Sequence, residues 1–153
     1  MRFVEDVLQK LGDRVRVRGD AGLSRTLLQH FPFAVGRVDW TRVPDARIQW
    51  APPERALGAN SPDVPFQTSH YLPVVERFLR NALADYRIED EWVAFCSDSV
   101  DEEFEVRLDS LEVLLRVSSD VPDHKYVFGL NANWCFTWSM EDDLHFGLAP
   151  RPS

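Results

Sequence analysis

The sequence predicts an α+β domain, with a mostly antiparallel sheet, helices packed mainly on one face and a C-terminal β-meander. Residues 3–11 and 69–86 carry apolar side chains at every third or fourth position, the spacing of amphipathic helices. The second half of the chain instead contains short apolar or alternating runs, which are typical of strands. Only a few residues separate the last three runs, so neighbouring strands are expected to be antiparallel.

The N-terminal part of the chain is expected to contain two helices and one short extended segment. The apolar stripe of residues 3–11 predicts the first helix, and Gly12 follows where a helix commonly ends. Residues 14–18 alternate arginine with valine and fit either a short edge strand or a loop. Ser24 is the predicted N-cap of a second short helix, which Pro32 stops.

The next region is predicted to be strand and loop. Short strands are expected at residues 35–40 and 47–50, with a turn through Pro44 and Asp45 between them. Residues 51–65 contain four prolines, a glycine and an asparagine. They indicate a long loop, and a long loop in a compact domain is usually either functional or mobile.

The middle of the chain carries the clearest helix and two expected strands. The helix begins near residue 69 and ends near residue 86, and Glu76 is expected to pair with Arg80 on its exposed side. The apolar run of residues 92–96 predicts a buried central strand. The alternation of residues 104–108 predicts another strand beside it.

Residues 109–117 fit two structures. Asp109 followed by Glu112 is like a capping box, which favours a helix. The alternation of Leu111, Val113 and Leu115 fits a strand instead. The helix is the preferred interpretation.

The C-terminal third predicts a meander with strands at residues 126–128, 134–140 and 144–148. Trp134 and Trp138 are an even number of positions apart, so they share one face of their strand. If that face is inward the two rings belong to the core, and if it is outward they form an aromatic patch for a partner.

The whole chain, residues 1–153, is long enough to form one domain with a substantial core, and residues 149–153 are expected to form a flexible tail. No apolar run reaches transmembrane length, and the N-terminus lacks the apolar segment of a secretory signal. Cys96 and Cys135 lie in apolar runs that suit reduced, buried thiols. We therefore expect a cytoplasmic protein that has no membrane partner.

Charge is distributed unevenly along the sequence. The whole chain has a net charge of −8, and residues 85–123 hold thirteen acidic and only three basic side chains. Binding to phosphate groups requires clustered lysine and arginine, so nucleic acid is not expected as a direct partner. A basic protein partner is compatible with this charge.

The sequence contains no recognisable catalytic, metal or cofactor motif. The four histidines and two cysteines match no ligand spacing, and the seven glycines form no phosphate-binding loop. Cys135 with His124 or His145 would make a thiol–imidazole pair, but Cys135 lies between two aromatic residues, as in a core strand. We expect no catalytic residue, no metal and no cofactor.

Clustered carboxylates are the candidate partner-binding residues. Those in the segment 98–105 follow a buried strand without a basic residue among them, so they repel one another. The cluster becomes favourable only when a positive group docks against it. Later carboxylates are expected to join this turn in space. The predicted partner-binding set is Asp98, Asp101, Glu102, Glu103, Glu105, Asp120, Asp123, Glu141, Asp142 and Asp143.

The C-terminal region prompts a family comparison. Residues 124–128 (HKYVF) and 134–147 (WCFTWSMEDDLHFG) resemble the C-terminal part of small bacterial immunity proteins of polymorphic toxin systems, which use contact-dependent inhibition or type VI secretion. The resemblance implies a cytoplasmic protein without enzymatic activity. It further implies that the partner is a cognate toxin domain, commonly a basic nuclease, whose active site is occluded.

Two other functions fit the sequence. One is a small-molecule binding or accessory domain, with a pocket between the sheet and the loop of residues 51–65. The other is an enzyme, such as a hydrolase that uses carboxylates brought together by folding. The enzyme hypothesis predicts an activity that is lost in Glu102→Gln or Asp143→Asn.

Overall fold

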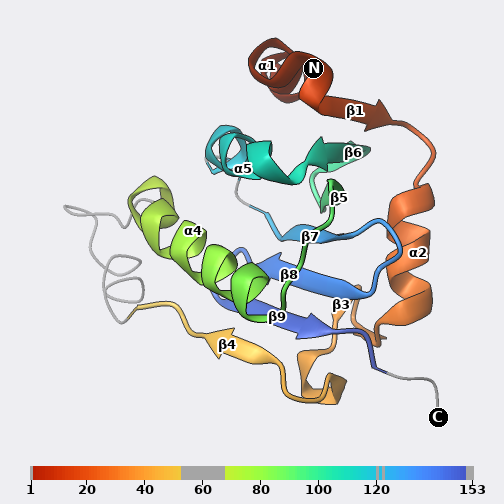
Figure 1. Ribbon diagram of the computed structural model, residues 1–153, viewed down its shortest axis with the longest axis vertical. Helices are drawn as coiled ribbons and strands as arrows, with labels where there is room; N and C mark the ends of the chain where they lie inside the picture. The colour runs from red at the N-terminus through yellow and green to blue at the C-terminus, as the bar shows by residue number, and fades with distance from the viewer. Residues whose placement is uncertain (1, 53–67, 120, 122, 151–153) are drawn as a thin grey trace.

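The computed structural model describes residues 2–52, 68–119, 121 and 123–150. The strands of the main sheet, named by sequence order, are β1 (Val15–Arg18), β4 (Arg47–Gln49), β5 (Trp92–Ser97), β6 (Val100–Arg107), β7 (Lys125–Gly129), β8 (Trp134–Trp138) and β9 (Leu144–Leu148). Their order in space is β1-β6-β5-β7-β8-β9-β4, and each neighbouring pair is antiparallel. Figure 1 shows them stacked from β1 at the top to β4 at the bottom. The predicted α+β class and C-terminal meander are confirmed.

The remaining elements cover the two faces of this sheet. The α-helices are α1 (Arg2–Leu11), α2 (Gly22–His30), α4 (Thr68–Asp85) and α5 (Leu111–Ser118). Short 3-10 helices are η1 (Gly12–Arg14), η2 (Trp40–Arg42) and η3 (Leu108–Ser110), and a separate hairpin joins β2 (Phe33–Ala34) to β3 (Arg37–Val38). In Figure 1, α1, α5 and α4 lie on one side of the sheet and α2 on the other. The expectation that helices pack mainly on one face is confirmed.

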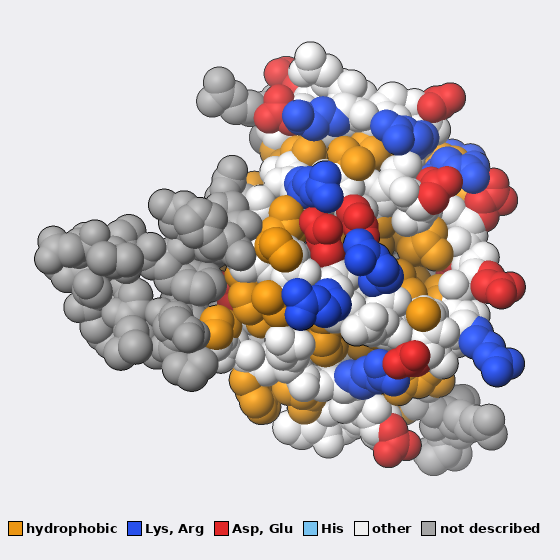
Figure 2. Space-filling view, turned by 60° about the vertical axis from the view of Figure 1, so that its left-hand side comes forward, with side chains coloured by type: hydrophobic (Ala, Val, Ile, Leu, Met, Phe, Trp, Pro, Cys, Tyr) orange, Lys and Arg blue, Asp and Glu red, His pale blue; other side chains and the backbone are white. Residues whose placement is uncertain are grey.

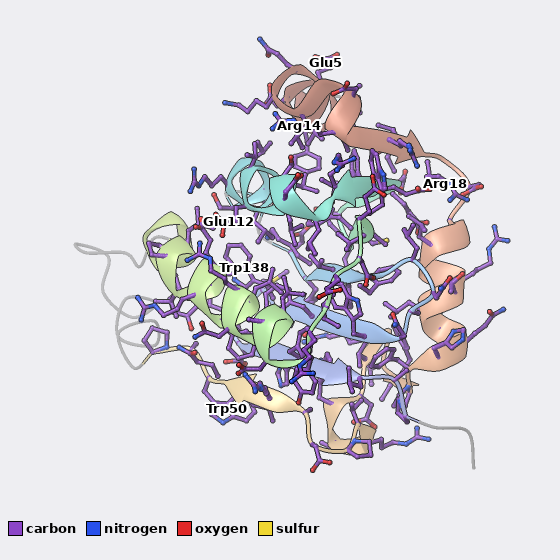
Figure 3. All side chains as sticks on the ribbon, in the orientation of Figure 1. Glu5, Arg14, Arg18, Trp50, Glu112 and Trp138 are labelled. Carbon is purple, nitrogen blue, oxygen red and sulfur yellow. The ribbon has the colours of Figure 1, made fainter. Side chains whose placement is uncertain are left out.

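The main core lies between the sheet and helices α1, α4 and α5. Helix α4 buries one residue on each turn, and these residues are Tyr71, Val75, Leu79 and Ala82. Below it, β8 directs Trp134, Phe136 and Trp138 into the same core. The two tryptophans therefore share an inward face and serve packing, as Figure 3 shows for Trp138 between the sheet and the helices. Burying each such ring contributes roughly 1.5–3 kcal/mol.

The outer surface of α4 and α5 is joined by ion pairs between the two helices. Arg80 of α4 pairs with Glu112 of α5, and Arg116 of α5 approaches Glu76 of α4 at 3.3 Å. Arg80 bonds to Glu112 and not to Glu76, although the charge of Glu76 adds to the raised pKa of Arg80, which is due mainly to Glu112. Figure 2 shows this side of the molecule, where basic and acidic side chains are interspersed among apolar ones. The helical side is therefore not an acidic surface.

A second, smaller core lies on the opposite face of the sheet. Helix α2 buries Leu23 and Leu27 there, followed by Phe31 just beyond its end. They pack in a cluster with Phe128 and Cys135 of the sheet. Strand alternation explains the division, because Phe128 and Cys135 point away from the face that carries the main core.

The N-terminus of α2 is capped from another part of the chain. The Glu103 carboxylate of β6 accepts hydrogen bonds from the Leu23 amide at 2.9 Å and from the Ser24 amide at 3.2–3.3 Å. Ser24, the predicted N-cap, instead lies inside the helix and donates its hydroxyl to Ala21 O. The local prediction was wrong because a carboxylate 79 positions away satisfies the amide that a local cap would bind.

The segment 33–50 differs from its prediction. Residues 35–40 do not form one strand, because Val35 and Gly36 both have positive φ and make the two-residue turn of the β2–β3 hairpin. The second predicted strand exists as β4, but it pairs with β9 at the edge of the main sheet. Between them, Val43 and Trp40 lie against Gly147 of β9, where an added Cβ would come within about 3 Å of both side chains.

Several remaining predictions are decided by the structure. Residues 14–18 contain the edge strand β1, and residues 109–117 lie mainly in α5, whose N-cap Ser110 makes no side-chain capping bond. The capping box predicted at Asp109 is therefore wrong, although the preferred helix is confirmed.

Ala149, predicted to begin a flexible tail, donates its amide to Asn133 O at 2.9 Å and belongs to the fold. Most of the predicted loop 51–65 lies outside the described residues. None of the described helices combines the length and apolar character needed to cross a membrane.

We predict that Glu103→Gln lowers the free energy of unfolding by about 1–2 kcal/mol, because the substitution weakens the charged cap on two amides of α2. Urea unfolding measured by circular dichroism tests this. Asp101→Asn on the same strand is the control, because Asp101 is exposed and should change stability little. Equal stability of both variants would show that the Glu103 carboxylate does not hold α2.

Candidate functional site

The α2 side of the sheet is only partly covered, and a cavity of about 590 Å³ remains beside the β2–β3 hairpin. Its floor is a row of side chains across three strands, Tyr126 of β7, Thr137 of β8 and His145 of β9, which are register partners. His124 extends the floor, and most of residues 34–41 form the opposite wall. We call this space the histidine cavity.

Trp40 fixes the wall of the histidine cavity against its floor. Its ring stacks on His145 with centroids 5.3 Å apart and an interplanar angle of 12°, and its Nε1 donates to Thr137 Oγ1 at 3.0 Å. Gly147 permits this approach, as described above. Trp40 is therefore fixed to the sheet by one aromatic and one polar contact.

The two histidines are both engaged within the protein. His145 also meets the edge of Trp50 at 5.7 Å, and burial lowers its pKa while Asp143 opposes that shift. His124 accepts a hydrogen bond at Nδ1 from the Met140 amide at 2.9 Å, which fixes the orientation of the ring. These contacts position the rings but join neither of them to a nucleophile.

Acidic groups outnumber basic ones around the histidine cavity. Asp39, Glu141 and Asp143 line it together with one guanidinium, that of Arg37. Arg37 lies 3.6 Å from Glu141 in an exposed ion pair, while Asp143 Oδ1 accepts from the Ala51 amide at 2.8 Å. The net charge of this lining is negative, which suits a cationic ligand group.

Exposed apolar side chains surround the same cavity. Of the eight large hydrophobic side chains that are exposed in the described chain, four lie here: Val35, Ile48, Trp50 and Met140. Val35 lines the cavity, Ile48 is the register partner of His145, Trp50 touches His145, and the Met140 amide binds His124. Trp50 is 66% exposed and lies at the margin of the molecule beside β4 (Figure 3). Such a group of exposed apolar side chains, in or next to a cavity, is typical of a contact surface.

Val35 combines exposure with backbone strain. It is 99% exposed and has φ of +54° at the tip of the hairpin. A β-branched residue in this left-handed region is a genuine outlier, and strain of this kind is concentrated at functional sites. No sequence pattern pointed to Val35, because the alternation around it resembled a strand.

Four of the ten predicted partner-binding carboxylates are used inside the protein. Glu103 is 5% exposed and caps α2, and Asp142 is buried and accepts from Trp138 Nε1 at 2.8 Å. Asp123 is buried with Lys125, 2.9 Å away, and also accepts from two serine hydroxyls of the β5–β6 turn. Glu105 pairs with Arg18 at 2.8 Å and with Arg16 at 3.4 Å. Their placement in an open acidic surface is corrected, because unpaired carboxylates are not buried without compensation.

The other predicted carboxylates are placed less uniformly. Asp98, Asp101 and Glu141 are exposed, and Asp143 is half-buried on the histidine cavity. Glu102 is half-buried, with one carboxylate oxygen enclosed and unbonded among the described residues. Asp120 lies outside the described residues. Whether any of these groups contacts a partner remains a prediction.

The expected meeting of distant turns is found at one end of the sheet. The Asp98 amide donates to His124 O at 3.2 Å, which places the β5–β6 turn beside the segment before β7. The His124 ring in turn binds the Met140 amide of the β8–β9 turn. The three turns are therefore neighbours, and the Asp123 carboxylate lies close enough to Asp98 to raise its pKa. That these carboxylates act together on a partner stays a prediction, and His124 was not expected among them.

The chemistry of the described site favours binding. Cys135 is fully buried, which raises its thiol pKa and disfavours the reactive thiolate. In the described part of the chain no hydroxyl or thiol is hydrogen-bonded to a histidine ring, and no three acidic, histidine or cysteine side chains could hold a metal together. The strongest features are a cavity, an apolar rim and an excess of negative charge.

We predict that Val35→Asn raises the free energy of unfolding by roughly 1 kcal/mol, because asparagine tolerates the left-handed conformation better than valine. The substitution also creates the Asn-Gly pair that this type of turn prefers. Thermal and urea unfolding measure the change. A less stable variant would mean that Val35 makes native contacts that outweigh its strain.

We predict that protonation of His145 destabilises the fold. The folded protein keeps the pKa of this ring below its ordinary value of 6.5, so it binds fewer protons than the unfolded chain at lower pH. The contribution to stability is therefore complete above about pH 6.5 and is lost as the pH falls toward the lowered pKa. His145→Gln should flatten the pH dependence of urea unfolding in that interval. An unchanged slope would contradict the prediction.

Comparison with known proteins leaves the function to be argued from these features. The chain matches no family model, no curated protein and no solved structure. The resemblance to immunity proteins in the C-terminal region accordingly remains a likeness of pattern. The geometry of the α2 side of the sheet is the basis for the functional proposal.

Proposed function

We propose that this protein acts in the cytoplasm as a non-enzymatic binding protein that blocks a basic toxin domain, in the manner of the immunity proteins it resembles. The surface around the histidine cavity makes the contact. The observation that carries this proposal is the gathering of four exposed apolar side chains, Trp50 and Val35 among them, around a cavity with an acidic lining.

The apolar rim would supply most of the affinity. Tryptophan and methionine are enriched in the centres of protein interfaces, and a few such residues usually contribute most of the binding free energy. Trp50 is held by His145 yet presents 66% of its surface to solvent. A large side chain that is already oriented loses little conformational freedom on binding, so more of its burial appears as affinity.

The charge of the protein would act mainly on the rate of association. A net charge of −8 attracts a basic domain over the range of the Debye length, about 8–10 Å at physiological salt. Once the two surfaces meet, the carboxylates of Glu141 and Asp143 lie beside the apolar rim and pair with basic side chains. The rate of association is therefore expected to fall as salt is added.

A binding role is preferred to catalysis because the polar groups of the cavity have structural partners. Thr137 accepts from Trp40, the Ser139 hydroxyl accepts from the Asp143 amide, and His124 accepts from Met140. A catalytic pair requires a nucleophile within hydrogen-bond distance of a base. Each of these side chains is instead engaged in fixing the shape of the site.

The histidine cavity also supports a second candidate function, the binding of a small molecule. Its volume of about 590 Å³ lies within the range of ligand sites, and aromatic rings line it together with a few polar groups. The pocket suggested by the sequence, against the loop 51–65, falls largely outside the described residues. A ligand retained in native mass spectrometry, with no affinity for any protein partner, would favour this function.

We predict that the chain binds the C-terminal domain encoded by an adjacent toxin gene, and that Trp50→Ala weakens this complex at least tenfold, a loss of about 1.4 kcal/mol. Val35→Asn should weaken binding while stabilising the fold. Isothermal titration calorimetry at low and high salt measures both effects. Leu8→Ala removes another exposed apolar side chain, on α1, and is the control, expected to leave affinity unchanged.

Two results would contradict the proposal. The first is the absence of a complex at micromolar concentrations and low salt. The second is equal affinity of the Trp50→Ala and Leu8→Ala variants, which would place the contact elsewhere on the surface.

A further inference from the structure

A second cavity lies on the same side of the sheet, beyond the β2–β3 hairpin. It has a volume of about 420 Å³ and is bounded by α2, the hairpin and the β5–β6 turn. Tyr126 lines both this space and the histidine cavity. We call it the acidic cavity, after the carboxylates of Asp98, Asp101 and Glu103 in its lining.

One wall of the acidic cavity is apolar and accessible. Leu27, Leu28 and Phe33 contribute to it, and Leu28 is 54% exposed although it belongs to α2. An exposed leucine at the mouth of a cavity offers a surface for an aliphatic chain. Since the aliphatic part of a long basic side chain commonly lies along such apolar surface, this wall suits lysine or arginine better than a compact ion.

The lining of the acidic cavity is negatively charged. Among its described lining residues there are three carboxylates and no lysine or arginine. Glu103 is already bound by the amides at the N-terminus of α2, so it also neutralises the positive end of that helix. Asp98 and Asp101 are the carboxylates that remain for a ligand.

The electrostatic state of Asp98 agrees with a missing positive group. Burial raises the pKa of Asp98 above its ordinary value, and the nearby Asp123 carboxylate adds to this shift. Arg37 and His124 act in the opposite direction without cancelling it. A cation placed beside Asp98 would favour its charged form.

Tyr126 supplies an independent indication of a ligand. Its side chain is 6% exposed, and its hydroxyl makes no hydrogen bond of normal geometry with the described residues, although it lies close enough to lower the pKa of Asp98. A buried hydroxyl without a partner is uncommon, because it loses its hydration without compensation. It lines the same cavity as the two available carboxylates.

We propose that the acidic cavity receives one arginine side chain of the protein partner. The aliphatic part of that side chain lies on Leu27, Leu28 and Phe33, and the guanidinium lies between Asp98 and Asp101 with the Tyr126 hydroxyl as a further acceptor. Arginine is preferred to lysine because its planar group presents several donors to acceptors on different sides. An apolar group would leave the hydroxyl and the carboxylates unsatisfied, and an anion would meet only negative charge.

That the arginine belongs to a protein partner rests on the proposed function. The arginine site makes the hairpin the centre of the contact, because the two cavities flank it and share Tyr126. The apolar rim of the histidine cavity would then provide the larger contact area, while the acidic cavity selects a partner that has an arginine at the corresponding position.

The site itself is tested with a small probe. N-acetyl-arginine-amide is titrated into the isotopically labelled protein and followed by amide chemical shifts, with N-acetyl-citrulline-amide as the uncharged probe of the same shape. We expect the arginine probe to shift the amides of the β5–β6 turn and of α2, and the citrulline probe to bind at least threefold more weakly. Equal binding of both probes, or shifts confined to other surfaces, would overturn the proposal.

Variants of the cavity sharpen the test. Asp101→Asn should weaken the arginine probe threefold to tenfold, while Asp13→Asn, an exposed carboxylate after α1, should leave binding unchanged. Tyr126→Phe removes only the hydroxyl, so we expect weaker binding with equal or greater stability. A Tyr126→Phe variant that binds the probe as tightly as the parent would contradict the assigned role of the hydroxyl.

The same variants separate this inference from the proposed function. If the toxin domain binds the parent and Asp101→Asn equally well, the arginine site is wrong and the binding function stands. If the arginine probe binds as expected but no protein partner does, the site stands and the proposed function fails.

Discussion

The architecture depends on the strict alternation of side chains along β8. Trp134, Phe136 and Trp138 point to one face, where α4 covers them, and Cys135 and Thr137 point to the other. The first set is large and apolar and holds three helices in place. The second set is small, so that face is filled only in part, by α2, the hairpin and Trp40. The open space that remains is the candidate site, and it exists because one strand divides large from small side chains between two faces.

Buried carboxylates connect the layers of this structure. Glu103 ties α2 to β6, Asp123 ties the β5–β6 turn to β7 through Lys125 and two serines, and Asp142 ties the β8–β9 turn to Trp138. Each of these groups accepts hydrogen bonds that offset the loss of its hydration. The acidity of the chain therefore serves two purposes. Some carboxylates are buried and position the turns, and others remain on the surface that those turns present.

The candidate site also contains several features that are unfavourable for folding. Val35 holds a strained backbone at a fully exposed hairpin tip, Trp50 leaves a large ring in water, and Tyr126 buries a hydroxyl that makes no hydrogen bond of normal geometry with the described residues. Each feature opposes folding, and all three lie around one pair of adjoining cavities. Natural proteins often break local rules where function requires it, so this coincidence favours a binding role for the α2 side of the sheet.

The sequence by itself determined the elements whose signal is local. The apolar spacing of residues 69–86 and the short connections of the C-terminal strands specify a helix and a meander, because side-chain period and connection length act within a few residues. It also identified the Asp98 turn as a place of clustered charge. Tertiary structure alone decided which carboxylates remain exposed, because the amides near Glu103 and the ammonium of Lys125 are brought to them by folding. It likewise placed Trp40, Tyr126 and His145 together from three distant segments. Periodicity cannot specify such contacts, because they depend on which strands become neighbours in the sheet and on the face to which each residue points.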